Sequence, residues 1–124
     1  MKRVLVITGA TGSGKTTVSK YLQSKHHLPK VITHTTRKPR EGEADGFDYY
    51  FETHESMRKL TLLEQVTYDF NQYGSSMEGL DQAWEKADLV TIVLDSKGAT
   101  TYKDALGAQA AVIFFTASEP DALK

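Results

Sequence analysis

The sequence predicts an α/β fold with a mostly parallel sheet flanked by helices. Two continuous apolar runs, RVLVIT at 3–8 and LVTIVL at 89–94, are typical of strands that are covered on both faces. A third run, AVIFFT at 111–116, has the same character. Helical patterns separate these runs, and strands that alternate with helices are typical of a parallel sheet. The length of 124 residues is compatible with one domain.

The first half of the chain predicts five further elements in order. Residues 9–14 form a glycine-rich turn, and residues 16–24 predict a helix because their apolar side chains share one face. Residues 31–35 predict a short strand. Residues 36–50 are polar and interrupted by proline and glycine, so we expect loops or a small irregular sheet. Residues 56–65 predict a helix.

The second half predicts helices between the remaining strands. Residues 74–76 are expected to form a loop and helix start, followed by a helix at 77–86 and a helix or loop at 97–106. Ser-Glu-Pro-Asp at 118–121 is typical of a helix N-terminus, with a capping hydroxyl followed by acids and a proline. Three large aromatic residues are expected in the core: Trp84, Phe114 and Phe115.

Composition excludes several classes of protein. The net charge is −1 and the basic residues are spread along the chain, so there is no general footprint for nucleic acid. The absence of cysteine excludes disulfides and thiolate zinc sites, and the four histidines have no metal-binding spacing. No stretch has the length of a membrane span. The start, MKRVLVITGA, predicts a buried strand rather than an export signal, so a cytoplasmic protein is the default expectation.

Residues 9–16, GATGSGKT, match the phosphate-loop pattern G-x-x-x-x-G-K-[ST] between a predicted strand and a predicted helix. Such a match arises by chance in about half a per cent of sequences of this length. Glycines allow successive backbone N–H groups to surround phosphate oxygens, and the helix dipole adds positive charge. The Lys15 ammonium is predicted to reach the β- and γ-phosphates, and the Thr16 hydroxyl to ligate Mg²⁺. The predicted triphosphate contacts are Gly9, Ala10, Thr11, Gly12, Ser13, Gly14, Lys15, Thr16 and Thr17.

A second cluster of charge surrounds Pro39. Proline blocks a helix and favours extended backbone before it, so Arg37 and Arg40 are expected on a turn. Two planar guanidinium groups at this spacing can converge on one phosphate. Phenolic donors at Tyr49 and Tyr73 can add hydrogen bonds to the same anion. Two nearby acids, Glu43 and Asp48, are expected to hold the arginines. Alone, an R-x-x-R pattern indicates only a solvated charged loop.

The whole stretch from 33 to 51, THTTRKPREGEADGFDYYF, closely resembles the signature of guanylate kinases, T-T-R-x-P-R-x-G-E followed by an acid or Asn, Gly and D-Y-x-F. The resemblance continues in order along the chain, at Leu-Leu-Glu 62–64, Tyr-Gly-Ser 73–75 and Leu-Asp 94–95. The positions that fit the signature are Thr35, Thr36, Arg37, Pro39, Arg40, Gly42, Glu43, Gly46, Asp48, Tyr49 and Phe51.

The resemblance implies a P-loop NTPase-type fold and a phosphoryl transfer from ATP to GMP, giving ADP and GDP. It implies that Glu64 accepts from the guanine N1–H and exocyclic amine, donors that adenine lacks as a pair. The implied catalytic residues are Lys15, Arg37 and Arg40. The implied acceptor site comprises Thr33, Arg37, Arg40, Glu43, Tyr49, Glu64, Tyr73, Gly74, Ser75 and Asp95.

The resemblance also implies an organisation for the single domain of residues 1–124. The nucleotide core is expected at 1–32 and 76–124, and a small inserted GMP-binding subdomain at 33–75. Partners are the small molecules GMP and ATP with Mg²⁺, without nucleic acid or membrane.

Two departures from the family pattern change these expectations. Val93 stands where the family's first metal-side acid is expected, so Mg²⁺ is expected to depend on Thr16, phosphates and water. The family's C-terminal lid and last core elements are absent after Lys124. Because arginines at the transferring group are worth about a thousandfold in related systems, we predict that these 124 residues bind GMP better than they turn it over.

Two other interpretations fit parts of the pattern. A non-catalytic guanylate-kinase-like module would use the acceptor site to bind a phosphopeptide, but it would not need the intact GATGSGKT. A phosphate-loop kinase for another small acceptor would not need Glu64 together with the segment at 73–75.

Overall fold

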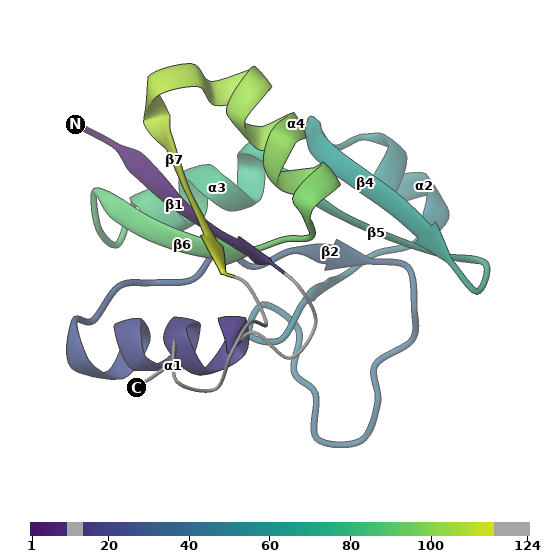
Figure 1. Ribbon diagram of the computed structural model, residues 1–124. Helices are drawn as coiled ribbons and strands as arrows, with labels where there is room; N and C mark the ends of the chain where they lie inside the picture. The colour runs from purple at the N-terminus through teal and green to yellow at the C-terminus, as the bar shows by residue number, and fades with distance from the viewer. Residues whose placement is uncertain (10–13, 116–124) are drawn as a thin grey trace.

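The computed structural model describes residues 1–9 and 14–115, and its core is a parallel sheet. Strand β1 (Arg3–Gly9) lies between β6 (Leu89–Val93) and β7 (Ala110–Phe115), and it is parallel to both (Figure 1). Central position explains the continuous apolar sequence of β1, because both faces of the strand are covered. The predicted α/β class with a parallel sheet flanked by helices is therefore confirmed. The helix start predicted at 118–121 lies outside the described residues.

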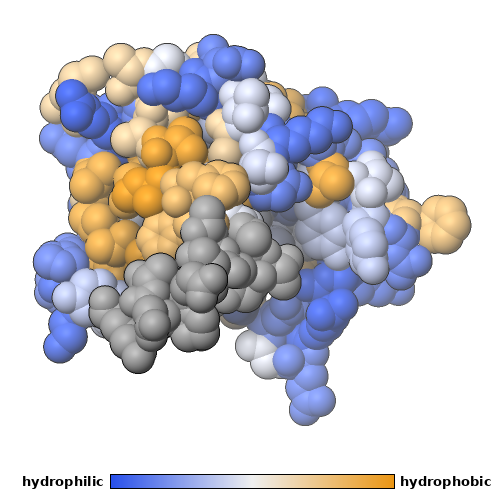
Figure 2. All heavy atoms as spheres, viewed as in Figure 1, coloured by the Kyte–Doolittle hydropathy of each residue, from blue (hydrophilic) through white to orange (hydrophobic). Residues whose placement is uncertain are grey.

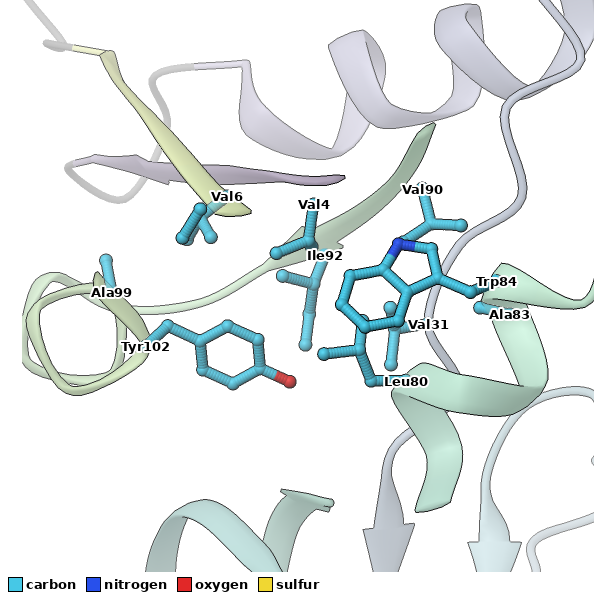
Figure 3. Close-up of a cluster of buried hydrophobic side chains, with 11 residues drawn as sticks. Val4, Val6, Val31, Leu80, Ala83, Trp84, Val90, Ile92, Ala99 and Tyr102 are labelled. Carbon is cyan, nitrogen blue, oxygen red and sulfur yellow. The ribbon is translucent and has the colours of Figure 1, made fainter. Parts of the chain in front are cut away.

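Helices cover both faces of this sheet. Figures 1 and 3 place α1 (Lys15–Lys25) on one face, and α3 (Met77–Trp84) with α4 (Ser96–Leu106) on the other. A 3₁₀ turn at Gly107–Gln109 leads from α4 into β7. Each of α3 and α4 begins with a side-chain cap: the Ser76 hydroxyl accepts from Gly79 N, and the Asp95 carboxylate accepts from Gly98 N. Among the described residues, no helix has the length and apolar character needed to cross a membrane.

The main core lies between the sheet and the pair α3 and α4. Figure 3 shows valines of β1 facing Leu80 and Trp84 of α3 and Tyr102 of α4. The Trp84 indole also donates to the Arg3 carbonyl over 2.9 Å, which satisfies its one polar atom. The core position predicted for Trp84 is confirmed. The core position predicted for Phe114 is wrong, because 59% of this residue is exposed, whereas Phe115 is half-buried.

The exposure of Phe114 reflects the position of β7 at the edge of the sheet. Figure 2 shows apolar atoms gathered over β7, next to the grey atoms. Val112 and Ile113 contribute to this surface and are also exposed. A continuous apolar sequence thus predicted the strand correctly, but it did not distinguish an edge strand from a central one.

A second sheet is built from residues 34–76 and has the order β3-β2-β5-β4. Short strands β2 (His34–Thr35) and β3 (Tyr50–Phe51) are parallel, whereas β4 (Leu62–Tyr68) and β5 (Asn71–Ser76) form an antiparallel hairpin. The hairpin also joins β2 through β5. Before β2, the segment at 29–31 pairs with Thr91 of β6, because Val31 N donates to Thr91 O and Thr91 N to Pro29 O. This pairing attaches the second sheet to the edge of the first.

The helix predicted at 56–65 is wrong beyond its first residues. Helix α2 (His54–Arg58) starts at a capping box between Thr53 and Ser56, and the chain then forms β4. The loop predicted at 74–76 is wrong as well, since these residues belong to β5, whereas the helix start predicted there is confirmed, because Ser76 is the N-cap of α3. Apolar residues at 60–63 fit a helical face and a strand about equally well. Because this segment pairs with β5, a tertiary contact, it forms a strand rather than a helix.

The turn between β4 and β5 holds two non-glycine residues in the left-handed region. Asp69 has φ 50° and Phe70 has φ 66°, and the Phe70 side chain is 91% exposed. Both angles fit a two-residue hairpin turn of type I′, in which glycine is preferred. Apolar atoms project at the tip of this hairpin in Figure 2. The turn therefore carries strain that no burial of the aromatic ring offsets.

Replacing Phe70 with glycine is expected to raise the free energy of unfolding by roughly 0.5–1 kcal/mol, because left-handed strain of about 1–2 kcal/mol is relieved and glycine entropy offsets part of it. Urea unfolding of the chain measures the change. Phe47→Gly is the matched control, because Phe47 is 71% exposed but does not have a positive φ. That control is expected to lose stability. A Phe70→Gly variant no more stable than the parent would contradict the strain.

Candidate active site

The predicted triphosphate loop begins where β1 ends and finishes where α1 begins. Gly14, the N-cap of α1, has φ 92°, a left-handed angle that favours glycine. Gly9 meets the backbone of Phe115 so closely that a Cβ would overlap its carbonyl. The Lys15 ammonium donates to the Gly9 carbonyl over 3.0 Å, so it spans the two ends of the loop. No acid lies in the first turn of α1, which leaves the positive end of the helix dipole unneutralised.

The interior of this loop lies outside the described residues. Ala10, Thr11, Gly12 and Ser13 belong to it, and so does the side chain of Thr16. Thr17 is exposed on the first turn of α1. The contacts predicted for these residues with a triphosphate stay predictions.

Arg37 is fixed on the acceptor side by Glu43. The guanidinium donates through Nη1 to Glu43 Oε1 and through Nη2 to Glu43 Oε2, both over 3.0 Å. This paired bond raises the pKa of Arg37 and lowers the pKa of Glu43. The Arg37 side chain is only 12% exposed. Glu43 Oε1 also accepts from Arg40 N over 2.7 Å, so one carboxylate sets both the side chain of Arg37 and the backbone turn after Pro39.

Two tyrosines lie beside Arg37. The Arg37 Cζ lies 5.4 Å from the centre of the Tyr49 ring, and the Tyr49 ring lies 6.2 Å from that of Tyr73. Tyr73 reaches this position because β5 pairs it with Thr35 of β2, two residues before Arg37. The structure therefore brings Arg37, Tyr49 and Tyr73 together, although the first and the last lie far apart in the sequence.

Two other charged residues of this segment, Arg40 and Asp48, do not take part in the ion pair between Arg37 and Glu43. Arg40 is exposed and makes no ion pair within the described part of the chain. Asp48, expected to hold an arginine, instead accepts from Ala44 N over 2.8 Å and closes the turn. Of the two predicted acidic partners, only Glu43 contacts the arginines.

Glu64 lies where β4 has an irregular register. The pairing with β5 shifts between Leu62 and Glu64, which places Glu64 opposite Ser75. Such a bulge re-aims a side chain relative to a regular strand. Gly74 allows the two strands to approach there, since a Cβ would lie 2.8 Å from the Glu64 carbonyl. Glu64, Gly74 and Ser75 are thus brought together as predicted.

Asp95 approaches Glu64 from the other sheet. Its carboxylate caps α4 by accepting from Gly98 N over 2.6 Å. A cavity of about 230 Å³ lies between the two acids and is lined also by Lys97, Gly98 and Thr101. Burial raises the pKa of Glu64, and the negative charge of Asp95 raises it further, whereas Ser75 acts in the opposite direction. Two acids beside one cavity suit a ligand that presents N–H donors.

A larger cavity of about 380 Å³ connects α1 with the acceptor side. Thr33 and Tyr49 line it opposite Ser19 and Lys20 of α1. Val93, at the end of β6, lines it too, at the position where an acid was expected. Among the described residues, no three His, Cys, Asp or Glu side chains gather as a metal site. A divalent cation here would depend on hydroxyl, phosphate and water oxygens, ligands that Mg²⁺ accepts.

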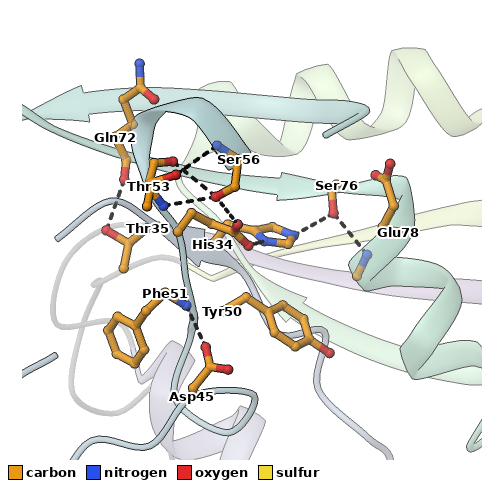
Figure 4. Close-up of polar contacts among 12 residues, drawn as sticks. His34, Thr35, Asp45, Tyr50, Phe51, Thr53, Ser56, Gln72, Ser76 and Glu78 are labelled. Atoms are coloured by element: carbon orange, nitrogen blue, oxygen red, sulfur yellow. Dashed lines mark hydrogen bonds and ion pairs between the residues drawn. The ribbon is translucent and has the colours of Figure 1, made fainter. Parts of the chain in front are cut away.

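A buried polar network holds the second sheet together, and its members were not predicted as functional. His34 Nδ1 lies 2.8 Å from Glu52 Oε2. His34 Nε2 lies 2.6 Å from the Ser76 hydroxyl, a contact that Figure 4 shows. Glu52 in turn accepts from the Ser56 hydroxyl over 2.6 Å. The network joins β2, α2 and the start of α3. The only sequence signal for this structural network was the position of His34 next to Thr35, a residue of the family signature.

Comparisons with known proteins all point to one family. The family model for guanylate kinase matches residues 1–124. A guanylate kinase of Neisseria meningitidis serogroup A is 38% identical over 108 residues, which cover 83% of this chain and 53% of that protein. A guanylate kinase of Campylobacter jejuni is 33% identical over 127 aligned residues, covering 98% of this chain and 62% of that protein.

A solved structure shows the same fold. The crystal structure of guanylate kinase from Anaplasma phagocytophilum matches with a TM-score of 0.68 and 26% identity, over 93% of this chain and 60% of that one. The chain thus spans between 53% and 62% of the length of the two curated relatives above. Because the family model matches all 124 residues of this chain and the fold is shared, this chain belongs to the guanylate kinase family.

Proposed function

We propose that the protein transfers the terminal phosphoryl group of ATP to GMP, giving ADP and GDP. The observation that supports this most directly is the fixed guanidinium of Arg37. Its bond with Glu43 uses one N–H of Nη1 and one of Nη2, and the Lys38 carbonyl takes a further Nη1 N–H. None of these hydrogen bonds among the described residues uses the Nε–H or the second Nη2–H, and these two donors lie on one edge of the planar group. That edge suits two oxygens of a phosphate.

The proposed acceptor site extends from this edge. Tyr49 and Tyr73 offer phenolic donors to the same phosphate, Thr33 lines the adjoining cavity, and Arg40 adds a positive charge from the solvent side. At the other end of the nucleotide, Glu64 accepts from the guanine N1–H and amine, and Ser75 and Asp95 border the base. Phosphate and base are thereby held by separate groups, which fixes the orientation of GMP.

On the donor side, the Lys15 ammonium would exchange the Gly9 carbonyl for phosphate oxygens of ATP. The loop N–H groups and the N-terminus of α1 would hold the same oxygens. Mg²⁺, bound through Thr16 and the phosphates, would neutralise charge on the transferring group. Lys15 and Arg37 would place both anions for in-line transfer, which requires positioning and charge compensation more than covalent help.

We also propose that different parts of the fold bind the two nucleotides. The three-stranded sheet and its helices, within 1–32 and 76–124, would bind ATP. The segment 33–75, which contains the second sheet except for its last residue Ser76, would form the inserted GMP-binding subdomain. All four strands of that sheet fall between His34 and Ser76, which supports this division.

Isothermal titration of the 124-residue chain with GMP, AMP and a phosphoserine peptide tests the proposal. We expect GMP to bind tightest. Tightest binding of AMP would contradict the guanine assignment, and tightest binding of the peptide would favour a non-catalytic module. A coupled assay with ATP and GMP then measures turnover, with Lys15→Ala as the inactive control.

Replacing Glu43 with glutamine is expected to weaken GMP binding about tenfold, because the amide loses one acceptor and Arg37 is no longer fixed by a charge-assisted pair. Titration calorimetry measures the dissociation constant. Glu41→Gln is the matched control, since Glu41 is exposed in the same loop. Equal losses in the two variants would show that only the net charge of the loop matters.

A further inference from the structure

Tyr102 carries a polar atom into the centre of the main core. The residue lies on α4 and is 0% exposed, and Figure 3 shows its ring extending into the cluster with the hydroxyl at its far end. Within the described part of the chain, this hydroxyl has no hydrogen-bond partner. A buried phenol without a partner is unfavourable, and phenylalanine would fill the same volume without that cost.

Ser75 presents the same situation beside it. Ser75 is also 0% exposed, and its hydroxyl has no hydrogen-bond partner among the described residues. The Ser75 hydroxyl nevertheless lies near enough to lower the pKa of Tyr102 and of Glu64, against the effect of burial on each. The charge of Glu64 in turn raises the pKa of Tyr102. The pairing of β4 with β5 also places Glu64 opposite Ser75, so the geometry and the pKa shifts agree that these groups are close.

The buried side chains of Ser75 and Tyr102 lie behind the cavity that Glu64 shares with Asp95. Glu64 lines the cavity itself, and its Oε2 lies 3.6 Å from where a Cβ on Gly98 would stand. Tyr102 projects from α4 one turn after Gly98. Helix α4 thus presents Asp95 and Gly98 to the cavity and Tyr102 to the layer beneath it.

We propose that Tyr102 is a positioning residue for Glu64, acting through Ser75. In the ligand-bound protein, the Tyr102 O–H donates to Ser75 Oγ, and the Ser75 O–H donates to the Glu64 carboxylate. Each hydroxyl, without a partner among the described residues now, then has one. The remaining lone pairs of Glu64 face the cavity and accept from the ligand.

The chain of hydroxyls has a chemical consequence for specificity, which rests on the proposed function. Donors directed at a carboxylate stabilise its ionised form. An ionised Glu64 accepts from a 6-oxopurine that presents N1–H and a 2-amino group, but a protonated Glu64 would offer a donor to a 6-aminopurine. Tyr102 therefore favours guanine by keeping the Glu64 charge at neutral pH, where burial and Asp95 oppose it.

Tyr102→Phe tests the inference, with GMP titrations between pH 5 and pH 8. GMP binding needs ionised Glu64, so affinity falls as pH falls through the Glu64 pKa. Removing the donor chain raises that pKa, so the acid midpoint of binding should move to higher pH. At neutral pH, we expect the dissociation constant for GMP to rise about five- to tenfold, as for the loss of one hydrogen bond to a charged group.

Three further measurements make the result decisive. Tyr21→Phe, on the exposed surface of α1, is expected to change neither affinity nor midpoint. In a Ser75→Ala background, Tyr102→Phe should have no further effect, since the two residues act in series. Unfolding without ligand should be unchanged or require more urea. A clear loss of stability would show that the hydroxyl is only structural and would overturn the inference.

Binding results separate this inference from the proposed function. If the parent chain binds GMP and Tyr102→Phe keeps both its affinity and its acid midpoint, Tyr102 does not position Glu64. If the parent chain does not bind GMP at all, the proposed function itself is wrong, and the inference falls with it.

Discussion

Replacing Arg37 with alanine is expected to weaken GMP binding by at least about a hundredfold. The change removes the two N–H donors on the free edge of the guanidinium, and charge-assisted hydrogen bonds are each worth about 1.5–3 kcal/mol. It also leaves the Glu43 carboxylate without its partner beside the phosphate, which adds repulsion. Titration calorimetry with GMP measures the loss.

Matched ligands and variants show whether this loss concerns the phosphate. Guanosine, which has no phosphate, should bind the Arg37→Ala variant as well as it binds the parent. Arg37→Lys should recover little, because an ammonium cannot reproduce the planar fork. Arg58→Ala, an exposed arginine at the end of α2, serves as the control and should bind GMP normally. A guanosine affinity that falls in parallel with that of GMP would point to a misfolded acceptor site instead.

Replacing Glu64 with glutamine is expected to reduce the preference for GMP over AMP by at least about a hundredfold. Sites built to hydrogen-bond a substrate reject analogues by about 10⁴–10⁵, because their own polar groups are left unpaired. The side-chain amide of the Glu64→Gln variant would present its NH₂ to the guanine donors, whereas adenine offers it an acceptor and a donor. The ratio of the two dissociation constants measures the change.

The pH dependence of GMP binding provides a second test of Glu64. Burial and Asp95 raise the pKa of this carboxyl above its usual 4.5. Acidification should therefore release GMP from the parent at a higher pH than an exposed glutamate would, and the Glu64→Gln variant should show no such transition. Because a raised carboxyl pKa means that the ionised form disfavours folding, the variant should unfold at the same or higher urea at neutral pH. A transition that persists in the variant would assign the proton to another group.

The two residues behind these predictions, Arg37 and Glu64, differ in how far the local sequence could predict them. The place of Arg37 on a turn was predictable from Pro39, because proline favours extended backbone before it, although its role in binding came from the family resemblance. Glu64 was not predictable in this way, since by periodicity it belonged to a predicted helix at 56–65 and only the family resemblance singled it out. The structure places it on β4 opposite Ser75. Here tertiary pairing overrode a local preference.

Local patterns predicted the strands of the parallel sheet and the helices α1 and α3, because buried strands and amphipathic helices carry their signals within a few residues. Only the tertiary structure decided that β7 exposes Phe114, that Glu43 and not Asp48 holds Arg37, and that Tyr102 is fully buried in the core. Those outcomes depend on which segments meet in space. Pairing and packing between distant parts of the chain set them, and no short stretch of sequence contains that information.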